Sequence, residues 1–204
     1  MKSVLVISDG TFHPPLLGRM ALHRALAEMT GFRFTRVSSI ELLPPNLKDF
    51  SALVIYVHHK KISNRSLAAL DSFVSHGGGL VGIHSATASF KQQKQYFEIL
   101  GGRFTGHGKV EPFEIRPTPG SAIFQDIPAF TVKDELYLHE LQPGIIPHFT
   151  ASCRGREIPV VWTHTYGQGR VCYAVPGHRA QTMQNPAYRR LLQRGLAWAA
   201  QEAP

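Results

Sequence analysis

Histidine side chains follow several of the short apolar runs in this sequence, a placement that suits acid–base or metal chemistry. The residues that come after these runs are Asp9 and His13, His59, His84 with Ser85, and His178. An imidazole gains and loses protons near neutral pH, and its neutral form binds zinc and similar ions. Because the carboxyl ends of parallel strands meet at one edge of a sheet, we expect these side chains to share one pocket. Histidines outside this pattern, such as His23, His76 and His148, are expected to be bystanders.

The segment from Gly79 to Ala86 has the features of a buried strand that enters a sharp turn. Several α/β enzymes present a catalytic side chain at such a turn, where backbone amides can also bind an anion. Either His84 or Ser85 stands at the apex, but the spacing GxSxG is absent, so a hydrolase-type serine is not indicated. Ser85 is equally well placed to cap the next segment. We expect the ring of His84 to point into the crevice with few apolar contacts, so that its loss harms function more than stability.

Two further segments place polar groups where a core would not need them. Gly106-His107-Gly108 frames a histidine with glycines, which permits unusual backbone angles and the close approach of a ligand, or forms only a turn. In a strand, Glu135, Tyr137 and His139 would fall on one face. That face either contributes to the pocket or is an exposed polar surface.

These observations predict a site made of two groups of residues. The predicted catalytic residues are His84, His107, Glu135 and His178, and the predicted substrate-binding residues are Asp9, His13, His59, Ser85, Tyr137 and His139. The set serves either general acid–base catalysis or the binding of a divalent metal such as zinc, for which His84, His107 and Glu135 are the candidate ligands. No HxxxH or HxH pair is present, so metal ligands would have to converge from distant loops.

The elements that must hold these residues alternate between strands and helices. Strands are predicted at 3–8, 33–37, 52–57, 80–83, 109–116 and 131–141, and a hairpin at 158–166 and 170–175. Helices are predicted from Leu22 to Met29 with a cap at Gly31, after Ser63 as N-cap up to the glycines at 77–79, at 92–100, and after Asn185 and Pro186. This alternation is typical of an open parallel sheet with helices on both faces.

Composition narrows the class of protein. The chain has 204 residues, which predicts one domain over residues 1–204, and no apolar run is long enough to span a membrane. The formal charge is +8, but the basic residues at 91–94 and 189–194 read as solvated surface rather than a nucleic-acid site, so nucleic acid is not the expected partner. Two cysteines, Cys153 and Cys172, are too few for a disulfide framework. The start of the chain lacks the pattern of a signal peptide, which favours the cytoplasm, and assembly into a homo-oligomer stays open.

Four motifs give the sequence a resemblance to a known family. They are Gly-Gly-Gly-Leu-Val-Gly-Ile-His-Ser-Ala from Gly77, Leu-Gly-Gly-Arg-Phe-Thr-Gly-His-Gly from Leu100, Asp-Glu-Leu-Tyr from Asp134, and Pro-Val-Val-Trp-Thr-His-Thr-Tyr-Gly-Gln-Gly-Arg-Val from Pro159, with Gly177-His178 after it. In their order and spacing they resemble the ThuA-like family, named for trehalose utilisation. The resemblance implies a flavodoxin-like fold, similar to the class I glutamine amidotransferases, with a β-rich C-terminal extension.

The resemblance also frames the expected activity. Glutamine amidotransferases need a cysteine at the turn after the strand, where this sequence has His84, and Cys153 and Cys172 lie in other segments, so glutaminase activity is not expected. Replacing either cysteine is therefore expected to spare activity. The family's link to sugar catabolism implies an enzyme that acts on a sugar or an oxidised (keto) sugar, as a hydrolase, lyase or isomerase. The alternative is a non-catalytic module that binds a sugar or a protein partner.

Overall fold

Strands from the first half of the chain, with one strand from its second half, form the parallel part of a sheet. A computed structural model describes residues 1–10 and 14–201. Its parallel strands are β1 (Lys2–Asp9), β2 (Phe32–Val37), β3 (Ala52–Val57), β4 (Gly79–Ile83) and β9 (Gly169–Ala174), in the order β2-β1-β3-β4-β9. Every residue of β3 and β4 is buried, which explains why these strands read as continuous apolar runs. The predicted α/β fold is confirmed.

The second half of the chain extends this sheet with antiparallel strands. Beyond β9, and within the described residues, the sheet continues through β8 (Arg156–Tyr166), β7 (Ile146–Cys153), β5 (Gly102–Pro117) and β6 (Phe130–Leu141). The sheet is therefore mixed, and the prediction of an open parallel sheet holds only for the half that contains β1 to β4 and β9. The hairpin of β8 and β9 was predicted, whereas β7 was not.

The segment Gly106-His107-Gly108 lies inside β5 and is not a loop or turn. The pairing of β5 with β6 shifts register between Phe104 and Gly106 and again between His107 and Val110. Neither Gly106 nor Gly108 has a positive φ, so the expectation of unusual backbone angles at these glycines is wrong. The two irregularities let one long strand bend and still present His107 toward its neighbour β6.

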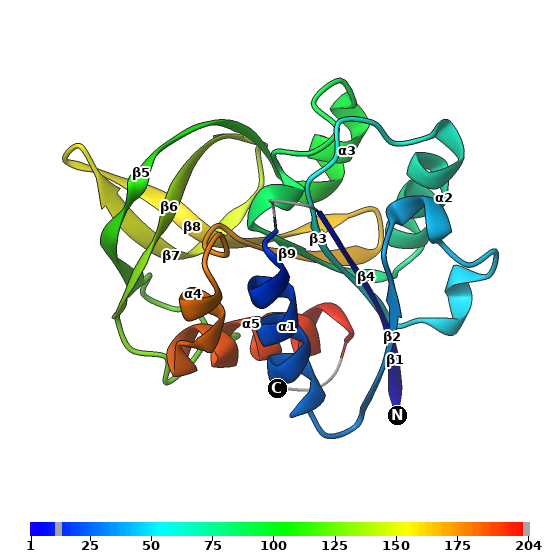
Figure 1. The fold of residues 1–204 in the computed structure, drawn as a ribbon, viewed down its shortest axis with the longest axis horizontal. Coiled ribbons are helices and arrows are strands. Elements are labelled where there is room, and N and C mark those ends of the chain that lie inside the picture. The colour runs from blue at the N-terminus through cyan, green and yellow to red at the C-terminus, as the bar shows by residue number, and fades with distance from the viewer. Residues whose placement is uncertain (11–13, 202–204) are drawn as a thin grey trace.

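Helices cover both faces of the sheet (Figure 1). They are α1 (Leu16–Ala27), α2 (Asn64–Ser75), α3 (Lys94–Leu100), α4 (Ala180–Gln184) and α5 (Pro186–Ala199). Short 3-10 turns occur at Ile40–Leu42, Leu47–Asp49 and His84–Ala86, the last of which is η3. In Figure 1, α1, α4 and α5 lie together, and α2 and α3 lie across the sheet from them. No helix among the described residues has the length and apolar character needed to cross a membrane.

Helix ends agree with the predicted caps in two of three places. Ser63 Oγ accepts a hydrogen bond from the Ser66 amide at the start of α2, and Asn185 caps α5 through the amides of Ala187 and Tyr188. Helix α1 differs, because it starts at Leu16 and ends with Glu28 as C-cap, so Gly31 does not cap it. Its predicted start was too late because Leu16, Leu17 and Met20 are exposed, which hides the apolar periodicity of the first turn.

Candidate functional site

His84 stands at the turn that follows β4, where η3 begins. Its φ is +45°, a left-handed conformation that is uncommon for a residue with a side chain, and the side chain is fully buried. Its Nδ1 lies 2.9 Å from the carbonyl oxygen of Val175, which only accepts, so Nδ1 holds the proton of that hydrogen bond. The other ring nitrogen, Nε2, faces Glu135 Oε2 at 3.6 Å. The left-handed backbone at His84 and the hydrogen bond to Val175 thus orient Nε2 toward the carboxylate of Glu135.

Glu135, on β6, lies among three histidine rings. Besides His84, His178 Nδ1 lies 3.4 Å from Oε2 and His107 Nδ1 lies 3.8 Å from Oε1. Burial by itself would raise the pKa of Glu135, but the contact with His84 and the electrostatic effects of the His178, His84 and His107 rings hold this pKa at about 2. The carboxylate is therefore ionised at neutral pH. We call His84, His107, Glu135 and His178 the carboxyl-edge cluster.

Asp134 holds the loop that presents His178. Its fully buried carboxylate accepts hydrogen bonds from the backbone amides of His178 at 2.9 Å and Arg179 at 3.2 Å, and from Thr182 Oγ1 at 2.5 Å. It also accepts from the amide of Glu135 at 2.8 Å. The sequence analysis missed this role, although the position of Asp134 beside Glu135 in a motif was the available signal.

Buried tyrosines on β3, β9 and α5 brace the same turns. Tyr56 donates to the carbonyl of Gly177, Tyr188 donates to that of Pro176, and Tyr173 donates to that of His84 at 2.5 Å. Burial raises the pKa of all three hydroxyls, so they stay protonated donors. Because such tyrosines look like ordinary core residues in a sequence, no local signal could have identified them.

Tyr137 and His139 share the face of β6 that carries Glu135, as the alternation predicted. The ring of Tyr137 lies 4.1 Å from that of His84, and it separates the cluster from His139. His139 Nε2 and Thr87 Oγ1 are joined by a hydrogen bond of 2.9 Å, and burial lowers the pKa of His139 to about 3. Their predicted roles in substrate binding stay predictions.

The remaining predicted residues have surroundings of their own, as far as the structure describes them. Asp9 and His59 form their own ion pair at 3.1 Å, and His13 lies outside the described residues. Ser85 is fully buried and does not cap η3, whose N-cap residue Ile83 offers no side-chain hydrogen bond, so the capping alternative is wrong. Ser85 Oγ has no hydrogen-bond partner among the residues described. A single cavity bordered by all of these residues stays a prediction.

The grouping of potential metal ligands differs from the predicted set. Within the described residues, His84, Glu135 and His178 each offer a ligand atom within 4.8 Å of the other two. His107, which was predicted in place of His178, has an exposed ring whose Nδ1 contacts the carbonyl of Gly108 at 2.7 Å. The sequence did not place His178 among the candidate ligands, because its loop approaches β6 only in the folded sheet.

Comparison with known proteins identifies the family. The ThuA family, described as trehalose utilisation, matches residues 3–199. The chain belongs to the ThuA family. No curated protein matches it.

Solved structures of similar fold extend beyond ThuA-like proteins. A ThuA-like protein from Parabacteroides merdae is 19% identical, with 98% of this chain and 90% of that chain covered and a TM-score of 0.85. A cytoplasmic protein from Salmonella typhimurium LT2 is 14% identical, with 98% and 99% covered and a TM-score of 0.74. A β-galactosidase from Rahnella sp. R3 is 13% identical, with 97% of this chain but 31% of that chain covered and a TM-score of 0.71. At these identities the likeness concerns the fold alone.

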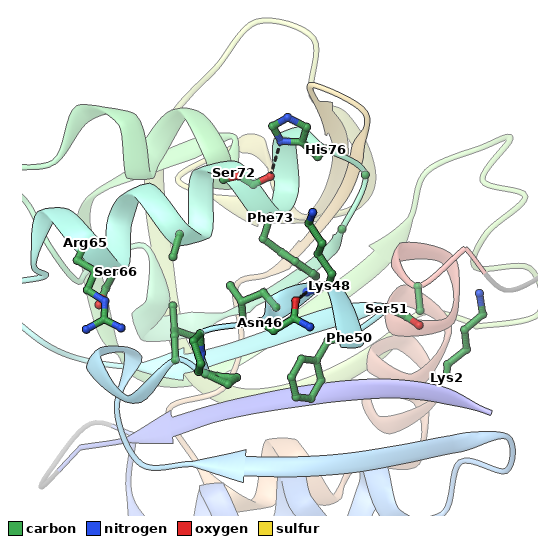
Figure 2. A pocket seen from close by; sticks show the side chains of 18 of the residues that line it. Lys2, Asn46, Lys48, Phe50, Ser51, Arg65, Ser66, Ser72, Phe73 and His76 are labelled. Atoms are coloured by element: carbon green, nitrogen blue, oxygen red, sulfur yellow. Dashed lines mark hydrogen bonds between the residues drawn. The ribbon is translucent and has the colours of Figure 1, made fainter.

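This ThuA-family chain has a cavity of about 830 Å³ at the opposite edge of the sheet, away from the cluster (Figure 2). Lys2, Ser51 and Gly78, which border it, stand at the amino ends of β1, β3 and β4. The acidic residue on its wall, Glu41, already accepts hydrogen bonds from Ser63 and Ser66. We favour the carboxyl-edge cluster as the functional site, because three histidine rings converge there on one buried carboxylate, Glu135, whose pKa is lowered to about 2.

The two cysteines are placed as free thiols, and neither faces the turn. Cys172 pairs with Val81 in the sheet, so it is nearer to the turn than its position in the sequence suggests. Its side chain, however, points at Gly195 on α5, and burial raises the pKa of its thiol to about 12. A thiol with this pKa is not a nucleophile at neutral pH.

Proposed function

We propose that this protein is a carbohydrate-acting enzyme whose catalytic groups are His84, His107, Glu135 and His178. The observation that supports this most directly is one ionised, largely buried carboxylate in contact with three histidine rings. The family's description, trehalose utilisation, supports a sugar as the substrate. An oxidised (keto) sugar suits the cluster best, because proton transfer beside a carbonyl needs groups that exchange protons near neutral pH.

In this proposal the residues divide their work according to burial. His84, fixed by Val175 and aimed at Glu135, polarises or deprotonates the substrate, and the more exposed His107 exchanges protons with it. Asp134 is a positioning residue, since it acts through the backbone of His178. Tyr137, Asp9 and His59 are the candidate substrate contacts. The reaction class is hydrolysis, elimination or isomerisation, and the protein would work in the cytoplasm, as the name of the Salmonella neighbour says of that protein.

The finer fold assignment supports this location of the site. The strand order β2-β1-β3-β4 is that of flavodoxin-like folds, and we propose that residues 1–204 form one such domain with a β-rich extension. In open α/β sheets of this type, ligands bind outside the carboxyl ends of the strands. The carboxyl-edge cluster lies there, at the ends of β4 and β9.

A non-catalytic module is the second candidate. One observation favours it: nearly the whole chain superposes on about a third of a β-galactosidase, so this fold also occurs as a part of a larger protein. Such a module would bind a sugar or a protein partner. A cluster of ionisable groups is more than sugar binding requires, which is why we place this alternative second.

Turnover of a sugar panel separates the two candidates. Purified protein is incubated with trehalose, glucose and their keto derivatives, and the products are followed by NMR. We expect conversion of a keto sugar, and a loss of turnover of about two to four powers of ten in Glu135→Gln. Glu140→Gln, at an exposed position of the same strand, is the matched control and should keep full activity. Binding without conversion would favour the module, and full activity of Glu135→Gln would overturn the proposal.

A further inference from the structure

We propose that His84 Nε2, Glu135 Oε2 and His178 Nδ1 hold a divalent transition-metal ion of the zinc class. These atoms come from the turn after β4, from β6, and from the loop after β9, and they all lie within 4.8 Å of one another. The inference rests on the proposed function only for the role of the ion, because binding of the ion is measured without any sugar.

The distances suit metal ligands better than hydrogen-bonded partners. Nitrogen and oxygen atoms that hydrogen-bond lie about 2.7–3.2 Å apart. Ligand atoms about 2.0–2.1 Å from a tetrahedral zinc ion lie about 3.3 Å from one another. His84 Nε2 and His178 Nδ1 lie 3.6 Å and 3.4 Å from Glu135 Oε2. Both separations are close to the edge of such a tetrahedron.

The tautomer of His84 turns a lone pair toward the carboxylate. Because Nδ1 donates to the carbonyl of Val175, the neutral ring has no proton on Nε2. In that neutral form, Nε2 presents a lone pair toward Glu135 Oε2, which lies 3.6 Å away. A hydrogen bond from the second ring nitrogen to a backbone carbonyl is also the usual way in which a metal-binding histidine is oriented.

Burial makes this arrangement costly unless a cation completes it. Among residues 1–10 and 14–201, neither His84 Nε2 nor Glu135 Oε2 has a hydrogen-bond partner, although both atoms are shielded from solvent. A carboxylate oxygen and a nitrogen lone pair that are buried without a partner lose their hydrogen bonds to water and gain none in the protein, which destabilises the fold. A metal ion between them satisfies both atoms at once.

The three ligand residues are held in place by the surrounding protein, and they leave one coordination position of the ion open. The carboxylate of Asp134 accepts hydrogen bonds from four donors, among them the backbone amide of His178. Asp134 therefore positions His178 and is not a metal ligand. Two histidines and one glutamate leave the fourth position of a tetrahedral ion for water or a substrate oxygen. There the ion would polarise the sugar oxygen, so that His84 would act on the substrate through the ion and the more exposed His107 would exchange the proton.

Metal binding by the untagged protein tests the inference. Chelator-treated protein is titrated with Zn²⁺ by calorimetry and with Co²⁺ by visible absorption. We expect one ion per chain and a Co²⁺ spectrum of four- or five-coordinate type. Glu135→Gln and His178→Gln should each weaken affinity by about a hundredfold or more. His107→Gln should bind like the wild type, which separates the set named here from one that contains His107. His59→Gln controls for binding at other histidines.

A second measurement avoids dependence on variants that do not fold. Crystals of the wild type soaked in Zn²⁺ should give an anomalous peak between the three named atoms at the zinc edge. A wild type that binds no ion, or a Glu135→Gln variant that folds and binds as tightly as the wild type, would overturn the inference. Such a result leaves the proposed function standing if the same wild type converts a keto sugar, so the two failures are distinguishable.

Discussion

At the scale of single residues, His84 combines functional placement with a structural role. The sequence led us to expect a ring with few contacts, and this expectation is wrong; the small effect on stability that was expected from it stays untested. The ring is fully buried, lies 4.1 Å from the ring of Tyr137 and stands on a left-handed backbone. The sequence shows that His84 follows a buried strand and stands at a turn. It does not show that the loop after β9 and one face of β6 cover the side chain in the folded protein.

The substitution His84→Ala is therefore expected to lower both activity and stability. We predict a loss of about 1–3 kcal/mol in the free energy of unfolding, because buried ring contacts and the Val175 hydrogen bond disappear. Turnover of the sugar should fall by about two to four powers of ten. His84→Asn is the matched variant, since asparagine tolerates the left-handed backbone. It should recover part of the stability and none of the activity. Urea unfolding and the turnover assay check this, and an active His84→Asn protein would remove the ring from the mechanism.

At the scale of elements, the loop from Pro176 to Arg179 determines where His178 and His84 lie. Gly177 has φ +153°, and a Cβ added there would lie 2.8 Å from the Cβ of His84. Gly177→Ala should consequently destabilise the protein by about 1–3 kcal/mol and displace His84 from Glu135. Gly144→Ala has a positive φ but no neighbour within 4 Å, so it measures the backbone cost alone. Equal melting temperatures of the two variants would show that the contact with His84 costs nothing.

Asp134→Asn tests the support of the same loop from its other side. The side chain of asparagine has an NH₂ group in place of one carboxylate oxygen. This NH₂ group cannot accept hydrogen bonds from the backbone amides that now donate to Asp134, so at least one of these amides would lose its partner. We predict a loss of about 2–4 kcal/mol in unfolding free energy, measured in urea. Glu140→Gln, at an exposed position of β6, should change it by less than about 0.5 kcal/mol. An Asp134→Asn protein as stable as the wild type would mean that the loop keeps its position without the carboxylate.

How much of these elements the sequence predicts depends on the range of the contacts involved. The buried strands β1, β3 and β4 and the caps at Ser63 and Asn185 follow from local patterns, and the sequence analysis located them. Strand β7 carries Pro147 and His148 within its apolar pattern, so its alternation is interrupted. The four residues predicted to be catalytic lie close together, with His84, His107 and His178 each near Glu135, and their catalytic role stays a prediction. The role of Asp134 was missed although it stands in a motif, because its contacts are with a loop about 44 residues away.

At the scale of the whole molecule, buried histidines link stability to pH. Burial lowers the pKa of His148 from 6.5 to about 4, and the ring is hydrogen-bonded to Ser121 and Thr163. Below pH 6.5, His148 binds a proton in the unfolded chain, whereas in the folded chain it does so only below about pH 4. The contribution of neutral His148 to stability is therefore present above pH 6.5 and is lost as the pH falls toward 4.

Acid unfolding of His148→Gln measures this linkage. Glutamine can still hydrogen-bond to both hydroxyls but does not titrate. We predict that the slope of unfolding free energy between pH 6.5 and 4.5 becomes shallower by up to about 1.4 kcal/mol per pH unit relative to the wild type. His76→Gln, at an exposed helix end, is the control and should leave the slope unchanged. Identical slopes for wild type and His148→Gln would show that His148 takes up its proton without unfolding.

The two edges of the sheet offer the most direct test of where this protein binds its substrate. Histidine rings report on both, since His84, His107 and His178 lie at the carboxyl edge and His76 lines the cavity at the opposite edge (Figure 2). Protein labelled with ¹⁵N in histidine rings is titrated with trehalose and its keto derivatives, and the ring resonances are followed by NMR. Our account predicts that a keto sugar shifts the resonances of His84, His107 and His178 and leaves that of His76 in place. A shift of His76 with the three cluster resonances unmoved, or no shift with any sugar, would contradict it.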